Sequence, residues 1–157
     1  EGVDPSDYYS KFNELKYTRA VLEETLRMYP SVVSVPKWTI AETQLGDYVI
    51  PERVQISLSV WGLHHNEKIW ENSTQFDPER FLERSQSSVA YDFVPFSLGQ
   101  RSCIGRKFAL IEAVFTLALT CRDYKFSPEN GACNFELKSD LTLHTKYPVK
   151  ISLTKRV

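Results

Sequence analysis

Apolar positions recur at helical spacing in the first part of the chain. Residues 11–29 contain neither glycine nor proline, and Leu15, Leu22 and Leu26 share one face of a helix. This pattern predicts a helix over residues 11–29. It should end before Pro30, because the residue that precedes a proline avoids helical angles. The first ten residues are polar and are expected to form a linker or a short loop.

Residues 31–63 follow a different pattern, which predicts β structure. Apolar residues from Val54 to Val60 alternate with polar ones, and this period of two is typical of a strand with one buried face. A short strand is expected from Tyr48 to Ile50, after the turn signal at Gly46. A short helix is expected around Asn66 to Trp70.

The rest of the chain combines a long loop, an apolar helix and short strands. Residues 71–102 carry many turn formers, and so long a stretch without regular structure is usually functional or disordered. A helix is expected from Ile104 to Cys121, deeply buried because apolar side chains nearly surround it. Short strands separated by Ser127-Pro128 and Asn130-Gly131 are expected from Tyr124 to Val157. The predicted fold class is α+β, mostly helical with small β-sheets.

The composition is that of one globular domain, and it narrows the classes of function. The 157 residues are 42% hydrophobic and 25% charged, which excludes a disordered tail, a collagen-like fibre and a coiled coil. The net charge of -1 gives no reason to expect a nucleic-acid partner. The apolar runs are shorter than a bilayer span requires. The three cysteines cannot all pair, which favours a reducing compartment.

The segment from residue 96 to residue 105 places a cysteine at the end of the long loop, directly before the apolar helix. Free amides and the dipole at a helix start favour an anion, so the Cys103 thiol is biased toward the thiolate that binds metals. Gly99 and Gly105 lack side chains, so a flat, bulky group can approach the backbone closely. Arg101 offers a cation suited to a carboxylate, and Phe96 is placed to shield the sulfur from water.

This segment resembles the cysteine-loop signature of the cytochrome P450 haem-thiolate monooxygenases. Every fixed position of that signature is filled, by Phe96, Gly99, Arg101, Cys103 and Gly105. The pattern continues into the helix with Phe108, Ala109 and Glu112. The resemblance implies that all of residues 1–157 form the C-terminal haem-binding segment of a cytochrome P450, a partial domain.

Two further motifs carry the same resemblance. One is Glu24-Thr25-Leu26-Arg27 on the first predicted helix, and the other is Phe76-Asp77-Pro78-Glu79-Arg80-Phe81 in the long loop. In the family, residues like Glu24 and Arg27 pair with an arginine like Arg80. This structural triad fixes the loop that delivers the cysteine. Two positions depart from the family pattern, namely Lys37, where an arginine is usual, and Arg53, where glycine is frequent.

The resemblance also implies a cofactor, a reaction and partners. The cofactor is heme b, iron protoporphyrin IX, with Cys103 as the axial ligand of the iron. The reaction inserts one atom of dioxygen into a lipophilic organic substrate. Electrons come from NADPH through a reductase, with cytochrome b5 as a further partner. Arg101 pairs a haem propionate, and Arg101, Arg106 and Lys107 supply positive charge to an acidic docking partner.

Two stretches correspond to substrate-facing parts of the family, residues 31–38 and residues 139–144. Both are apolar, which indicates a lipophilic substrate. The segments at residues 62–66 and 97–99 are most similar to eukaryotic microsomal members that act on fatty acids or sterols. The resemblance places the longer parent protein at the cytosolic face of the endoplasmic reticulum membrane. This chain is expected to have no transmembrane helix, so the membrane contact would lie in an N-terminal region outside it.

Several other interpretations compete with this one. Family members are several times longer, so the isolated chain is expected to be inactive and is alternatively a truncated, non-catalytic product that binds partners. A haem-thiolate isomerase or lyase that needs no reductase is a second alternative. Cys121 and Cys133 are expected to be inert core thiols. His64 and His65 are expected to have a surface or capping role rather than to bind a metal.

Overall fold

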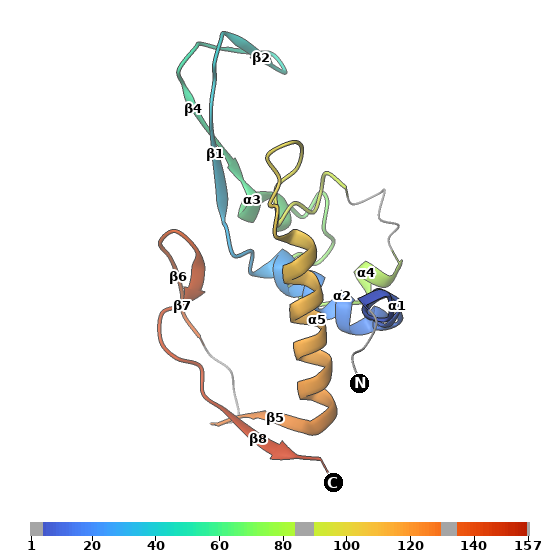
Figure 1. Ribbon diagram of the computed structural model, residues 1–157. Helices are drawn as coiled ribbons and strands as arrows, with labels where there is room; N and C mark the ends of the chain where they lie inside the picture. The colour runs from blue at the N-terminus through green and yellow to red at the C-terminus, as the bar shows by residue number, and fades with distance from the viewer. Residues whose placement is uncertain (1–4, 84–89, 130–134, 157) are drawn as a thin grey trace.

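The structure is a computed structural model that describes residues 5–83, 90–129 and 135–156, and the side chains from residue 10 onward. Along the described residues, two helices are followed by four short strands, three helices and four more short strands (Figure 1). The helices of the described residues are α1 (Pro5–Glu14), α2 (Lys16–Met28), α3 (Val60–His64), α4 (Arg80–Glu83) and α5 (Arg106–Asp123). The strands are β1 (Ser34–Trp38), β2 (Thr43–Leu45), β3 (Tyr48–Ile50), β4 (Gln55–Ser59), β5 (Tyr124–Pro128), β6 (Leu137–Ser139), β7 (Leu143–Thr145) and β8 (Ile151–Lys155).

The strands of the described residues pair as small antiparallel sheets of two strands each. The pairs are β1 with β4, β2 with β3, β5 with β8, and β6 with β7. The β1–β4 ladder runs from Ser34 opposite Ser59 to Trp38 opposite Gln55. The mixture of helices and small sheets is the one that the sequence predicts.

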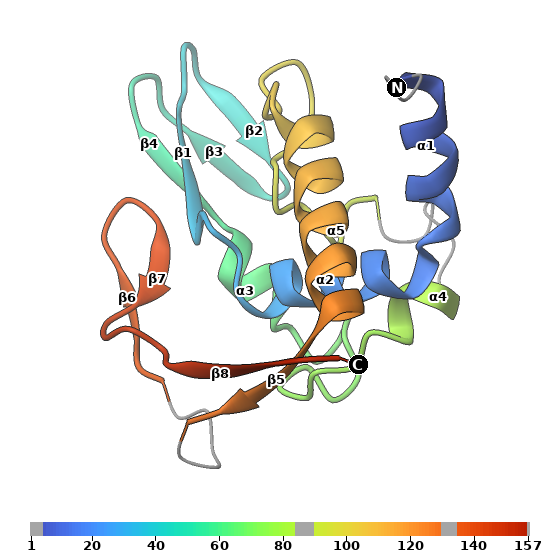
Figure 2. The same ribbon diagram turned by 60° about the horizontal axis from the view of Figure 1, so that its bottom comes forward.

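The core is small and lies where α2 meets the segments on either side of α4. Its buried apolar side chains are Ala20, Met28, Val60, Trp70, Val94 and Val114. The aromatic rings of Trp70, Phe81 and Phe93 contact one another, with centroids between 4.9 and 6.4 Å apart. Helix α5 packs across α2, as the two views show (Figures 1 and 2). The cluster therefore joins α2, α4 and the start of the loop that carries Cys103.

The first helical region differs from the prediction at its start and in its interior. The chain is already helical from Pro5, and the helix expected over residues 11–29 is interrupted at Leu15, which separates α1 from α2. Leu15 has ψ at 50°, outside the helical range, so the two helices take different directions. Helix α2 ends at Met28, and Pro30 follows as predicted.

The predicted strand from Val54 to Val60 is shorter and more exposed than expected. It ends at Ser59, because the Ser59 side chain accepts a hydrogen bond from the Gly62 amide at 3.0 Å and caps helix α3. The prediction that this strand has one buried face was wrong, since Leu58, which should lie on that face, is 47% exposed. The β1–β4 hairpin extends away from the helices, so neither face is covered along most of its length (Figure 1). Asn66 to Trp70 forms a single turn rather than a helix.

Helix α5 also differs from the prediction. It begins at Arg106 rather than at residue 104, and Val114 is its one fully buried residue among those described. Phe108 is 72% exposed. The helix was expected to be deeply buried, but α2, α1 and β5 cover only part of its circumference. Cys121 is therefore an exposed free thiol, not a core residue.

The C-terminal strands follow the prediction in kind but not in their boundaries. Ser127 and Pro128 were expected to separate two strands, yet both lie within β5, where Pro128 is opposite Ile151. Proline is tolerated there because β5 is a strand of a two-stranded sheet, with one edge free of ladder bonds. Asn130-Gly131 and Cys133 lie outside the described residues.

Replacing the capping side chain should weaken α3 without disturbing the adjoining strands. We expect Ser59→Ala to lower the free energy of unfolding by about 1 kcal/mol, the usual cost of a lost N-cap. The measurement is a denaturant titration of the complete gene product that contains this sequence. Ser57→Ala, at an exposed position of the same strand, is the matched control. Equal losses for the two variants would contradict the capping role.

Candidate functional site

Glu24 is a fully buried carboxylate that is surrounded by hydrogen-bond donors. Arg27 binds it in bidentate fashion, with Nε donating to Oε2 at 2.7 Å and Nη2 donating to Oε1 at 2.9 Å. Arg80 Nε donates to Oε1 at 3.2 Å, and the Asp77 amide donates to the same oxygen at 2.8 Å. The structure thus brings together the three residues of the expected triad. Helix geometry explains the first pair, because residues three apart lie on one face.

Arg27 uses its remaining donors to hold two other segments. Its Nη1 donates to the backbone carbonyl of His64 at 2.8 Å, and its Nη2 donates to that of Gln75 at 3.3 Å. The guanidinium also lies over the ring of Trp70, 5.5 Å from the ring centroid. A buried arginine needs this many partners, because each unpaired N–H would lose its hydration without compensation. Arg27 therefore ties α2 to α3 and to the loop after Trp70.

His64 is fully buried, contrary to the surface or capping role expected of it. Its Nε2 accepts a hydrogen bond from the Val94 amide at 2.9 Å, and its ring stacks on Phe93 at a centroid distance of 5.3 Å. Burial lowers the pKa of His64 to about 4, and the charge of Arg27 acts in the same direction. His65 is half-buried, with its Nδ1 2.9 Å from the Trp61 carbonyl.

The cysteine loop is closed by backbone hydrogen bonds. The Ser97 amide donates to the Val94 carbonyl at 3.0 Å, and the Cys103 amide donates to the Phe96 carbonyl at 2.9 Å. Gly99 has φ at 81°, in the left-handed region where glycine is favoured. The second of these bonds brings the backbones of Phe96 and Cys103 side by side.

Cys103 carries an exposed, free thiol at the start of α5. A Cβ atom placed on Gly105, the residue before the helix, would lie 3.8 Å from the Cys103 sulfur. The sulfur is thus near the N-terminus of the helix, and the neighbouring Ile104 and Phe108 side chains are exposed. Within the described ranges, the His, Cys, Asp and Glu side chains make no group of three that could hold a metal ion.

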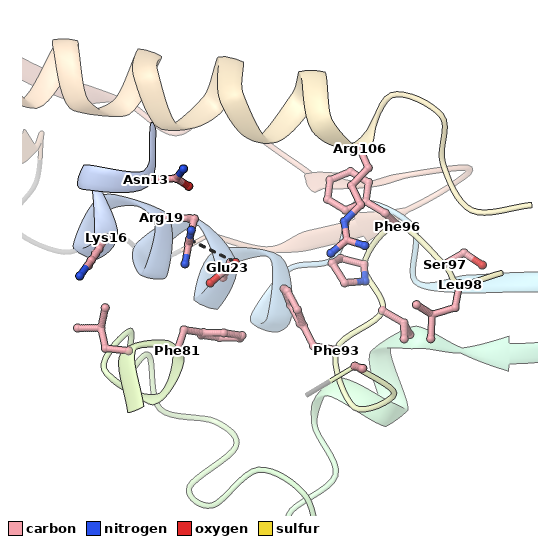
Figure 3. A pocket seen from close by; sticks show the side chains of 14 residues that line it. Asn13, Lys16, Arg19, Glu23, Phe81, Phe93, Phe96, Ser97, Leu98 and Arg106 are labelled. Atoms are coloured by element: carbon pink, nitrogen blue, oxygen red, sulfur yellow. Dashed lines mark ion pairs between the residues drawn. The ribbon is translucent and has the colours of Figure 1, made fainter. Parts of the chain in front are cut away.

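A cavity of about 520 Å³ lies beside the cysteine loop (Figure 3). Its walls come from the α1–α2 junction, α4, the segment from residue 90 to residue 98, and the first residue of α5. Arg106 points into it next to Phe96, and Arg19 Nε lies 3.8 Å from Glu23 Oε1. Burial raises the pKa of Glu23, and the charges of Arg19 and Arg106 oppose this shift. Arg106 therefore contributes its charge to this cavity, although it is exposed like Arg101 and Lys107.

The profile of the family described as Cytochrome P450 matches residues 3–152. The chain belongs to the cytochrome P450 family. "Probable cytochrome P450 4p3" of Drosophila melanogaster is 35% identical over 93% of this chain and 29% of its own length. "Cytochrome P450 4g15" of the same organism is 36% identical over 91% of this chain and 25% of its own length. The chain thus spans about a quarter to a third of the length of these P450 relatives.

The P450 family is one of haem-thiolate monooxygenases, so oxidoreductase chemistry, haem and iron are the family's properties. Members use reductases as redox partners and act on lipophilic substrates. In the described part of this P450 chain, the helices lack the combination of length and apolar character that a membrane span needs.

Sequence reasoning missed one residue of the network, His64. The sequence carries no signal for this role, because the contacts of His64 with Arg27 and Val94 span 37 and 30 positions of the chain.

Neutralising Glu24 should be far more damaging than neutralising its neighbour. We expect Glu24→Gln to lower the free energy of unfolding by about 3–5 kcal/mol, because the buried Arg27 guanidinium and the part-buried Arg80 guanidinium lose their counter-charge. Glu23→Gln is the matched control, since the adjacent carboxylate makes only a 3.8 Å ion pair at the cavity. Denaturant titration of the complete gene product measures both. The assignment is wrong if Glu24→Gln costs no more than Glu23→Gln.

Proposed function

We propose that Cys103 would provide the thiolate ligand of a haem b group, and that the complete protein is a monooxygenase acting on a lipophilic substrate. The observation that carries the proposal is an exposed thiol on a hydrogen-bonded loop, held at the start of a helix. In this proposal, residues 1–157 are the C-terminal part of the P450 fold. The endoplasmic reticulum location expected for the parent protein belongs to the same proposal.

The residues around Cys103 fit such a group. A single thiolate can hold a metal firmly only when the metal brings its other ligands, and an iron porphyrin brings four nitrogens. Gly99 has open space where a side chain would stand, and Gly105 leaves the sulfur uncovered on one side. The exposed apolar side chains of Ile104 and Phe108 provide surface that a macrocycle can cover. The donor set and its surroundings therefore suit haem.

Each residue of the loop has a distinct task in this proposal. Cys103 supplies the anionic sulfur, and the helix start near it favours the negative charge. The Cys103 amide is occupied by the Phe96 carbonyl, which fixes the loop backbone behind the sulfur. Arg101 is exposed and available to pair a propionate. When bound, the haem supplies the binding and activation of dioxygen, and the protein supplies ligand, orientation and exclusion of water.

The proposed substrate side rests on two apolar stretches that the fold brings together. The Leu143 amide donates to the Ser31 carbonyl at 2.8 Å, so the two stretches meet at these residues. Leu141 is 90% exposed at the turn between β6 and β7. Apolar side chains exposed on adjoining segments favour a lipophilic substrate over a charged one.

Electron delivery is proposed to use the face that carries Arg101 and Lys107. Both are exposed close to Cys103 in the sequence, and positive charge there attracts an acidic partner. The proposed donor is an NADPH-dependent reductase, with cytochrome b5 as a second acidic partner. A haem-thiolate isomerase or lyase would need neither, so dependence on a reductase separates these reactions.

Cys103→Ser should remove the thiolate signature of the haem. We expect the complete gene product to lose the red-shifted Soret band that its reduced carbon-monoxide complex gives with a sulfur ligand. Cys121→Ser is the matched control, because Cys121 is also an exposed free thiol and lies on α5. Retention of the band in the Cys103 variant, or its absence from the unmodified protein, would refute the assignment.

Reversing the charge of Lys107 should slow reduction by the reductase. We expect Lys107→Glu to lower the rate several-fold at low ionic strength and to lose most of that effect in high salt. Stopped-flow reduction measures both rates. Lys125→Glu on β5, also exposed, provides a control for net charge. Identical rates for the two variants would argue against docking at this face.

A further inference from the structure

We propose that His64 is a positioning residue for the cysteine loop. Its backbone carbonyl is held by Arg27 while its ring holds the Val94 amide, so it joins the Glu24–Arg27 pair to the loop. His64 lies far in sequence from each of these partners. The inference goes beyond the proposed function because it assigns a task to a residue outside the cysteine signature. The contacts of His64 do not depend on the proposed function. Only the effect of His64 on haem binding rests on that function.

A continuous path of hydrogen bonds runs through this residue. Arg27 Nη1 donates to the His64 carbonyl at 2.8 Å, and the Val94 amide donates to His64 Nε2 at 2.9 Å. The Val94 carbonyl accepts from Ser97 at 3.0 Å. The next bond of the loop joins Cys103 to the Phe96 carbonyl. The path therefore starts at the buried Glu24–Arg27 ion pair of α2 and reaches Cys103.

Burial makes the ring a strong constraint rather than an incidental contact. His64 is fully buried, Val94 is 4% exposed, and Phe93 stacks on the ring. Inside the protein, an amide that loses its acceptor is not compensated by water, so the Val94 amide needs the ring nitrogen. Histidine suits the position because its flat ring both stacks on Phe93 and presents an acceptor.

The hydrogen bond also fixes the protonation state of the ring. Nε2 accepts from Val94, so it carries no proton, and the neutral ring must hold its proton on Nδ1. The charged group that faces the ring from α2 is Arg27, itself neutralised by Glu24, and His65 is the titratable neighbour on the chain. Phe93 and Val94, which face it from the loop, carry no charge. A protonated His64 would place an N–H against the Val94 N–H and break the path.

This state makes stability depend on pH in a defined direction. The folded pKa is about 4 because of burial, and the ordinary value is 6.5. The unfolded chain therefore binds more protons between these values, and the contribution of His64 to stability is present above pH 6.5 and declines as the pH falls to about 4.

The first test observes the ring in the unmutated complete gene product. Selective ¹⁵N labelling of histidine should show His64 as the neutral Nδ1–H tautomer at pH 7 and still neutral at pH 5. A ring that titrates at its ordinary value, or that carries its proton on Nε2, overturns the proposal. This test needs neither a variant nor a functional haem site, so its failure is distinct from failure of the proposed function.

The second test compares two substitutions by amide hydrogen exchange at Val94. His64→Leu removes the acceptor and should speed exchange by about tenfold, the effect of one lost hydrogen bond. His64→Gln restores an acceptor oxygen that does not titrate, so it should recover most of the protection and reduce the stability loss between pH 6.5 and 4 by the share that His64 contributes. His65→Gln is the matched control and should change neither.

A purely space-filling role gives a different pattern. In that case His64→Leu would protect Val94 as well as the unmodified protein does, and His64→Gln would show no rescue. If His64→Leu fails to fold, the comparison of His64→Gln with the unmodified protein still decides, because the two proteins share every other titrating group and differ only in the side chain at position 64. A loss of stability between pH 6.5 and 4 that is as large in His64→Gln as in the unmodified protein overturns the proposal.

Discussion

The structure depends on one buried carboxylate. Glu24 is inaccessible to water, and its charge is tolerated because Arg27, Arg80 and the Asp77 amide donate to its two oxygens. Removing either guanidinium would leave buried charge uncompensated, so the partners are held together strongly. The loop after Trp70 contains only α4 as regular structure among its described residues, and these contacts give it a fixed course. The loop after Trp70 has little regular secondary structure, so ion pairs and hydrogen bonds to Glu24 and Arg27 hold it in place.

This buried network explains how an exposed thiol can have a defined position. Most of α5 and the hairpins is poorly covered, and the apolar core around Trp70 is small. The rigid part is the contact between α2, α3 and the start of the cysteine loop, where His64 and Val94 meet. Cys103 projects from that base toward open space. Such an arrangement suits a ligand that must stay accessible to a large cofactor while its backbone does not move.

The sequence predicted features that depend on local spacing and on recognisable motifs. It failed for features that depend on which distant segments of the chain pack together. The contacts of Arg80 with Glu24 were anticipated because two motifs resemble those of the cytochrome P450 family. The strand at Tyr48–Ile50 followed from its turn signal. The start of α3 was missed because the Ser59 cap competes with strand propensity. The burial of α5 was overestimated, since an apolar helix needs partners that cover it and periodicity does not supply them. The role of His64 required knowledge of which segments meet.

The central claim is that the Glu24 network holds the cysteine loop, and amide exchange at Cys103 tests it most directly. Arg80→Gln removes one guanidinium of the network, and Arg80 lies 23 positions before Cys103 in the chain. The account expects the Cys103 amide, which donates to Phe96, to exchange faster in this variant of the complete gene product, while the β5–β8 amides are unchanged. Exchange at Cys103 that equals that of the unmodified protein would contradict the account.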